Sequence, residues 1–154
     1  PQSEPAEEAL PPEEEQATEA GSLPVRVLDA GQQSAVRVPV ARTVASPLVY
    51  ADVWSAIHAN VSSPPSPPAV DFDRETVVVL VLGERRTGGY SVAVQRVTEE
   101  RKSVTVFVEV TSPAPGAMVT MALTSPYQLC AIPVTDKPIV FAGDDVREGY
   151  SPYD

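Results

Sequence analysis

Hydrophobic and polar residues alternate along several short stretches of this chain, and this pattern is typical of β-strands. The clearest case is residues 103–111, where valine occupies every second position from Val104 to Val110. Residues 75–82 instead contain a continuous apolar run, which indicates a strand that is buried on both faces. The same criteria predict further strands at 23–28, 35–44 (with Pro39 marking an edge or a break), 90–97, 118–124, 127–133 and 138–142.

Only residues 45–60 have the spacing of an amphipathic helix. Ser46 can cap its start and Pro47 suits the first helical position. The residues that share one face are Tyr50, Val53, Trp54, Ile57 and Val61. Many short strands with a single helix predict a mainly β fold, either an antiparallel β-sandwich or a strongly curved sheet with one short α-helix packed on it. A second sheet and this helix would cover the two faces of 75–82.

Charge and composition divide the chain into three parts. The net charge is −10, and residues 1–22 contribute −7 because they contain seven glutamates and no basic residue. Such a Pro/Glu-rich segment cannot bury enough surface to fold, so we expect 1–22 to be a disordered tail. It is either a tether or a solubilising leader. Residues 23–143 are predicted to form one β-rich domain, and 144–154 a polar C-terminal tail.

Several classes of function do not fit the composition. The chain has no basic stripe of the kind that binds nucleic acid, and no apolar run near the ~20 residues that span a bilayer. One cysteine excludes an intramolecular disulfide and a cysteine-based zinc site. The composition does not settle the compartment, because a signal peptide or lipid anchor would lie upstream of Pro1.

The residues that could carry chemistry do not form a catalytic or metal-binding pattern. His58 falls beside the apolar helix stripe, with no nucleophile signature around it. Asp71 and Asp73 lack the rest of a calcium loop, and Cys130 lies in an apolar strand with no basic neighbour. We therefore predict that the protein is not an enzyme and needs no cofactor or metal.

Two stiff loops are better candidates for function. One contains paired glycines that can adopt positive φ, followed by an aromatic residue. The other is braced by two prolines, so ordering it on binding would cost little entropy. A second tyrosine follows Ser125-Pro126. The predicted partner-binding residues are Thr87, Gly88, Gly89, Tyr90, Pro113, Pro115, Gly116 and Tyr127.

These motifs resemble a known family. The motifs are Gly83-Glu84, Thr87-Gly-Gly-Tyr90, Ser112-Pro-x-Pro-Gly116, Met118-Val-Thr120 and Leu123-Thr-x-Pro-Tyr127. Together they resemble the C-terminal domain of PrcB-like protease complex subunits, over roughly residues 70–142. The resemblance implies an exported bacterial accessory protein that associates with a subtilisin-like serine protease and supports its stability or maturation. Ala117 departs from the family pattern, which often has cysteine there, so no redox role is implied at this position.

We therefore expect a non-enzymatic protein-binding module, either secreted or tethered to the bacterial envelope as a lipoprotein. Two alternatives stay open. Thr87-Gly-Gly-Tyr90 is also similar to a loop of chagasin-type protease inhibitors, which are Ig-like sandwiches, although the other two inhibitor motifs are missing. The protein could also be a structural module of an envelope assembly, in which an edge strand pairs with a neighbour.

Overall fold

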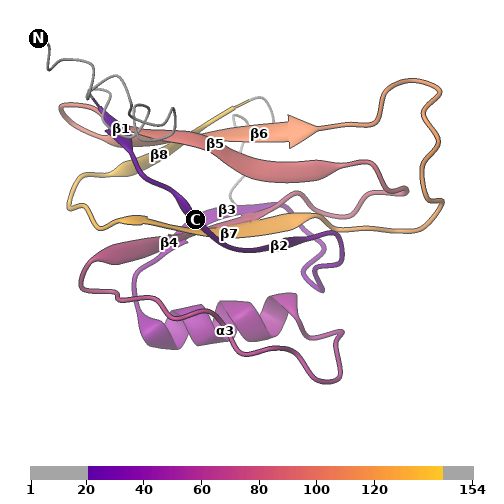
Figure 1. Cartoon of the computed structure of the whole chain (residues 1–154), viewed down its shortest axis with the longest axis horizontal. Helices are drawn as coiled ribbons and strands as arrows, with labels where there is room; N and C mark the ends of the chain where they lie inside the picture. Colours follow the sequence, from indigo (N-terminus) through magenta and orange to yellow (C-terminus); the bar gives the residue numbers. More distant parts are fainter. Residues whose placement is uncertain (1–20, 144–154) are drawn as a thin grey trace, which may run out of the picture.

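Two four-stranded sheets lie face to face, with one helix on the outer side of the second sheet (Figure 1). The computed structural model describes residues 21–143. The first sheet has the order β1 (Ser22–Leu23), β5 (Ser91–Glu99), β6 (Val104–Thr111) and β8 (Ile139–Ala142). The second has the order β2 (Arg26–Gly31), β7 (Tyr127–Pro133), β4 (Glu75–Val81) and β3 (Val40–Val44), and the helix is α3 (Pro47–Ile57).

The mainly β sandwich with one helix that the sequence predicts is confirmed. One pairing differs from a purely antiparallel arrangement, because β6 and β8 run parallel. Residues 1–20 and 144–154 lie outside the described residues, and so do the predictions for most of the acidic tail and for the C-terminal tail. Within the described part, no helix is long and apolar enough to cross a membrane.

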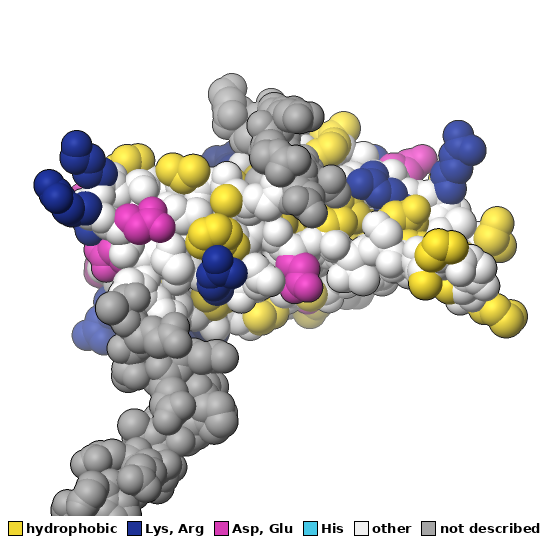
Figure 2. Space-filling model, turned by 90° about the horizontal axis from the view of Figure 1, so that it is seen from above, with side chains coloured by type: hydrophobic (Ala, Val, Ile, Leu, Met, Phe, Trp, Pro, Cys, Tyr) yellow, Lys and Arg dark blue, Asp and Glu magenta, His cyan; other side chains and the backbone are white. Residues whose placement is uncertain are grey.

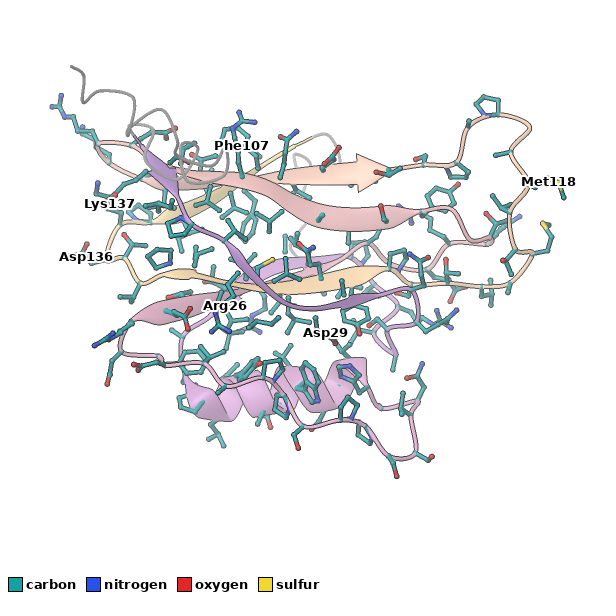
Figure 3. The ribbon with its side chains drawn as sticks, in the orientation of Figure 1. Arg26, Asp29, Phe107, Met118, Asp136 and Lys137 are labelled. Carbon is teal, nitrogen blue, oxygen red and sulfur yellow. The ribbon has the colours of Figure 1, made fainter. Side chains whose placement is uncertain are left out.

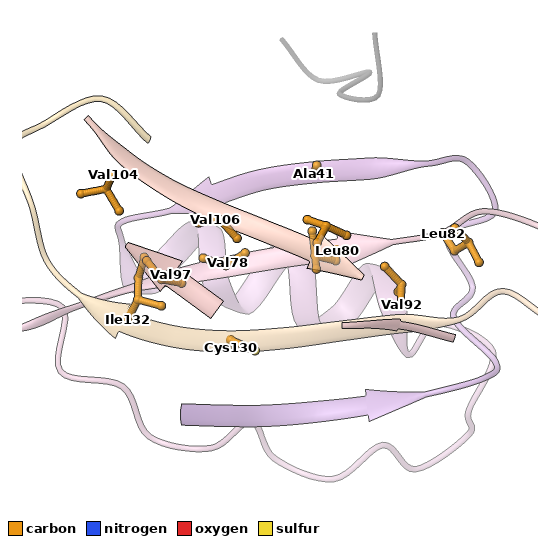
Figure 4. Packing of buried hydrophobic residues seen from close by; sticks show 11 residues of the cluster. Ala41, Val78, Leu80, Leu82, Val92, Val97, Val104, Val106, Cys130 and Ile132 are labelled. Atoms are coloured by element: carbon orange, nitrogen blue, oxygen red, sulfur yellow. The ribbon is translucent and has the colours of Figure 1, made fainter. Parts of the chain in front are cut away.

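Strand β4 is buried on both faces, as its continuous apolar run predicts. Val78 and Leu80 point into the core between the two sheets, and Val77 and Val79 point toward α3. Because alternate side chains of a strand face opposite ways, one run supplies both cores. The core between the sheets (Figure 4) is built from Ala41, Val78, Leu80, Leu82, Val92, Val97, Val104, Val106, Val108, Cys130 and Ile132.

Helix α3 closes the second core. The Ser46 hydroxyl accepts a hydrogen bond from the Val49 amide at 3.2 Å, which caps the first turn as predicted. The helix ends at Ile57, so the predicted range of 45–60 is too long, and Val61 is exposed beyond it. The buried helix residues are Tyr50, Trp54 and Ile57.

Three strand predictions need correction. Residues 118–124 are not a strand, because their apolar residues have no core to cover and the segment projects beyond the sheets. The predicted strand 23–28 is divided between β1 and β2, which belong to different sheets. The predicted strand 35–44 begins only after Pro39, whose missing N–H cannot contribute to a ladder.

Candidate functional site

Three connections lie together at one end of the sandwich (Figure 1). They are the β2–β3 connection (residues 32–39), the β4–β5 connection (82–90) and the β6–β7 connection (112–126). We call this surface the loop end. The two loops predicted from the sequence are the second and third of these connections, so the structure brings them together.

Hydrogen bonds join the β4–β5 and β6–β7 connections along their length. The backbones of Arg85 and Thr124 exchange two hydrogen bonds, at 2.8 and 2.9 Å. Further along, the Thr124 hydroxyl donates to the Thr87 carbonyl at 2.9 Å, and the Gly88 amide donates to the Thr120 carbonyl at 2.9 Å. Thr87 and Gly88 therefore hold the longer loop in place.

Gly89 allows the two loops to approach closely. Its φ is +93°, a conformation that side-chain-bearing residues rarely adopt. A Cβ atom at this position would lie 2.9 Å from Cβ of Pro113 and 3.0 Å from a methyl carbon of Val119. Both the backbone conformation and the contact thus require glycine, whereas Gly116 (φ +80°) has open space around it.

The β2–β3 connection supports the other two, although none of its residues was among the predicted partner-binding residues. The Gln32 side-chain amide donates to the Tyr90 carbonyl at 2.9 Å, and that of Gln33 donates to the Leu123 carbonyl at 3.3 Å. Ser34 and Ser125 are fully buried between these segments, and the Ser34 amide donates to the Ser125 carbonyl. The only sequence signal was two adjacent amide side chains in a turn.

The segment that projects from this support is uncharged and exposed. We define the tip as residues 117–123. Met118 is 99% exposed, Met121 82% and Leu123 51%, and no charged residue occurs between Glu109 and Asp136. Figure 3 shows Met118 directed away from the body, and Figure 2 shows hydrophobic side chains gathered at the same end. Both methionines of the chain lie in this tip.

Comparison with known protein families identifies this part of the chain. Residues 76–133 match the family model described as PrcB C-terminal. This segment belongs to the PrcB C-terminal family. The match includes the β4–β5 and β6–β7 connections with the whole tip. No curated protein and no solved structure matches the chain.

Tyr90 is half-buried at the base of the β4–β5 connection, within the segment that matches the PrcB C-terminal family. Its ring packs against the core between the sheets, and the Arg85 guanidinium lies 5.5 Å from the ring centroid. Pro113 is also half-buried, against Gly89, whereas Pro115 and Gly116 are exposed. The predicted residues therefore differ in position: some build the support, and only the exposed ones are open to a partner.

Tyr127 requires a correction. The sequence analysis placed it on the partner-binding surface, but its side chain is buried, and its hydroxyl donates to Oδ2 of Asp29 at 2.8 Å. Burial is the largest cause that raises the pKa of Tyr127 above its ordinary value, and this hydrogen bond is the next largest. Tyr127 lies at the start of β7, where both faces of the strand are covered, so we exclude it from the contact surface.

His58 shares this buried cluster and links α3 to two strands. Its Nε2 lies 3.0 Å from Oδ2 of Asp29 on β2, and its Nδ1 lies 2.9 Å from the Trp54 carbonyl oxygen. Its ring stacks on Trp54 and meets Tyr127 of β7 edge-on. Both ring nitrogens thus face acceptors within the fold. This arrangement holds the end of the helix against the sheet.

The remaining candidates are structural. Cys130 is fully buried and burial raises its pKa to about 12, so the reactive thiolate is disfavoured. Asp71 and Asp73 are exposed, and the Asp71 carboxylate accepts a hydrogen bond from the Asp73 amide. Within residues 21–143, no group of three or more His, Cys, Asp or Glu side chains could hold a metal ion.

Proposed function

We propose that this protein is a non-enzymatic accessory subunit that binds a protease or a protein of the same complex through its loop end. PrcB C-terminal family membership suggests association with a protease-related complex. The observation that carries the docking proposal is the loop end itself, where an exposed apolar tip stands on a prearranged support. Contiguous exposed apolar groups commonly mark interaction sites.

Prearrangement favours binding because less conformational entropy is lost on association. Backbone hydrogen bonds from Gly88 and Arg85 position the β6–β7 connection, and Pro113 and Pro115 restrict its backbone before the tip begins. The tip itself keeps flexible methionine side chains, which adapt their shape to an apolar partner surface. The loop end therefore combines a fixed backbone with adaptable contacts.

Two further expectations belong to this proposal. We propose that the chain acts outside the cytoplasm, secreted or tethered to the bacterial envelope, with the acidic segment 1–22 as the tether. We also propose that it catalyses no reaction, since His58 is engaged on both ring nitrogens within the fold and the Cys130 thiol is buried. A subtilisin-like serine protease is the partner that the family resemblance implies.

Affinity purification from source cells tests the proposal. The tagged wild-type chain is compared with the double variant Met118→Ser, Met121→Ser and with Leu48→Ser, an exposed position on the first turn of α3. Recovered proteases are detected by a fluorophosphonate label specific for active serine hydrolases and by mass spectrometry. We expect the wild type and Leu48→Ser to recover a protease or its complex. If neither a protease nor its complex is recovered with the wild type or with Leu48→Ser, the proposed function is rejected.

One observation favours protease inhibition as a second candidate. Three connections lie together at one end of a sandwich, and adjacent loops of this kind can enter an active-site cleft. Inhibition is tested with a panel of cysteine and serine proteases at micromolar concentrations of the purified chain. Loss of activity in one class would support it, and unchanged rates across the panel would remove it.

A further inference from the structure

We infer that the tip inserts into an apolar cleft of a protein partner whose rim carries carboxylates, which the arginines of the loop end bind. This inference rests on the proposed function and specifies the chemistry of the surface that the partner must present. It combines the exposed apolar tip with the charges around it.

The loop end is basic on an acidic chain. Its three connections contain Arg37, Arg85 and Arg86 against a single acid, Glu84, a formal balance of +2, whereas the whole chain carries −10. Figure 2 shows basic side chains close to the hydrophobic group at this end. Complementary charge guides association and selects partners, so the complementary rim is acidic.

Arg37 supplies an independent indication that an acceptor is missing. Its Nη1 is buried and, among the described residues, has no hydrogen-bond partner. Its Nε lies 3.7 Å from Oε1 of Glu84, beyond hydrogen-bonding distance. The side chain is still 37% exposed, so a partner can approach it. A guanidinium binds a carboxylate through two parallel hydrogen bonds, and the exposed part of this side chain is open to such a contact.

Arg85 is held ready for a similar contact. Its Nη1 donates to the Glu84 carbonyl at 3.1 Å, and its guanidinium lies against the Tyr90 ring. A stacked guanidinium loses less rotamer freedom on binding than a mobile one. Arg86 is exposed beside it. Together these side chains place positive charge beside the tip, while the tip itself contains none.

The charges favour a protein cleft over a lipid bilayer. Recognition of anionic lipid headgroups typically uses clusters of 4–8 basic residues, and the loop end has three, with Glu84 among them. A cleft on a protein needs only the few apolar anchors and rim charges that are present here.

Site-specific photo-crosslinking locates the surface that the tip contacts. Benzoylphenylalanine is placed at position 118 and, as the control, at position 48 of the full chain, and both are irradiated in source cells. We expect the probe at position 118, and not the one at position 48, to crosslink to the same protein that the wild-type chain recovers in affinity purification. The crosslinked peptide should map to an apolar cleft bordered by Asp or Glu. Mapping to a flat polar surface or to a basic cleft would overturn the inference.

Binding to the same purified partner then separates the two contributions. We expect Met118→Ser, Met121→Ser to weaken the affinity at least tenfold, and Arg85→Gln, Arg86→Gln to slow association and flatten its salt dependence. Leu48→Ser should bind as the wild type does. If the complex forms with wild-type affinity in both double variants, the inference fails and so does docking through the loop end, while association with a protease complex stands. If no variant and no wild-type chain forms a complex, the proposed function fails.

Other occupants of the tip give distinct results, and each would overturn the inference. Cosedimentation with vesicles of 70% zwitterionic and 30% anionic phospholipid, lost in the methionine variant, would identify a membrane. A concentration-dependent dimer in light scattering, lost in the same variant, would identify a second copy of the chain. The chain's own acidic tail would be identified by two results together. Deletion of residues 1–20 would tighten partner binding, and in the absence of partner the probe at position 118 would crosslink to residues 1–20.

Discussion

Replacing Gly89 by alanine tests whether the two loops are held together by close contact. The added Cβ would lie 2.9 Å from Pro113 Cβ and 3.0 Å from a Val119 methyl carbon, within a backbone at φ +93°. Pro113 is rigid, so it cannot move its ring aside without moving the loop. Gly116→Ala is the matched control, because Gly116 also has a positive φ (+80°) but no atom within 4 Å of its Cβ position.

The two substitutions share one cost and differ in another. Placing a side chain at positive φ costs roughly 1–2 kcal/mol at either position. Overpacking adds about 1–3 kcal/mol only at position 89. We therefore expect Gly116→Ala to lower the free energy of unfolding by about 1–2 kcal/mol, and Gly89→Ala by about 2–5 kcal/mol. The difference between them measures the contact between the loops.

Urea unfolding, followed by the fluorescence of the single tryptophan, measures both losses. Trp54 is buried beneath the second sheet, so its emission reports unfolding of the sandwich rather than movement of the loop end. Binding to the partner is measured in parallel, and Gly89→Ala should weaken it more than Gly116→Ala does. Equal stability losses, within about 0.5 kcal/mol, would show that position 89 is not in close contact with Pro113 and Val119.

Three further predictions concern other parts of the molecule. Tyr127→Phe removes the donor to the Asp29 carboxylate and should lower the free energy of unfolding by about 1–3 kcal/mol in urea; an unchanged midpoint would contradict the buried hydrogen bond. Because burial raises the pKa of Cys130 to about 12, its contribution to stability is complete below the unfolded thiol's pKa of about 8.5 and is lost between there and pH 12, by up to about 1.4 kcal/mol per pH unit. Cys130→Ala should therefore show a shallower stability loss between pH 8 and 10.5, and parallel curves would refute this linkage. Dilute peroxide should oxidise Met118 and Met121 without changing the urea midpoint while weakening partner binding, and a destabilised chain would mean that these side chains are buried.

The fold could be predicted because its strongest signals are local. The two-faced run of β4 requires a cover on each side, and the sequence offers only other strands and one capped amphipathic helix for this purpose. The alternation that predicts β6 is equally direct. The strand predicted at residues 118–124 was wrong, since a short run of apolar residues identifies a strand only where a core exists to receive one face. Met118 and Met121 have no such core.

The loop end could be predicted only in part. Paired glycines and prolines identified two stiff loops, but their contact depends on the register between β4 and β7, which no local pattern gives. The support from Gln32 and Gln33 depends on long-range geometry for the same reason. The error at Tyr127 had a signal in the sequence, because the residues from Tyr127 to Ile132 are mostly apolar on both faces of the strand. In a strand whose two faces are both buried, the Tyr127 ring is covered whichever face it points to.

The family match and the loop end do not have the same boundaries, and this difference bears on specificity. Residues 76–133 contain the tip and two of the three connections, yet the carbonyls of Tyr90 and Leu123 are held by Gln32 and Gln33, outside the matched segment. Arg37, with its unpaired donor, also lies outside it. In the proposed complex, the matched segment supplies the apolar element that the partner cleft receives. The β2–β3 connection fixes its orientation and part of the charge beside it, so substitutions there can change partner choice without altering the tip.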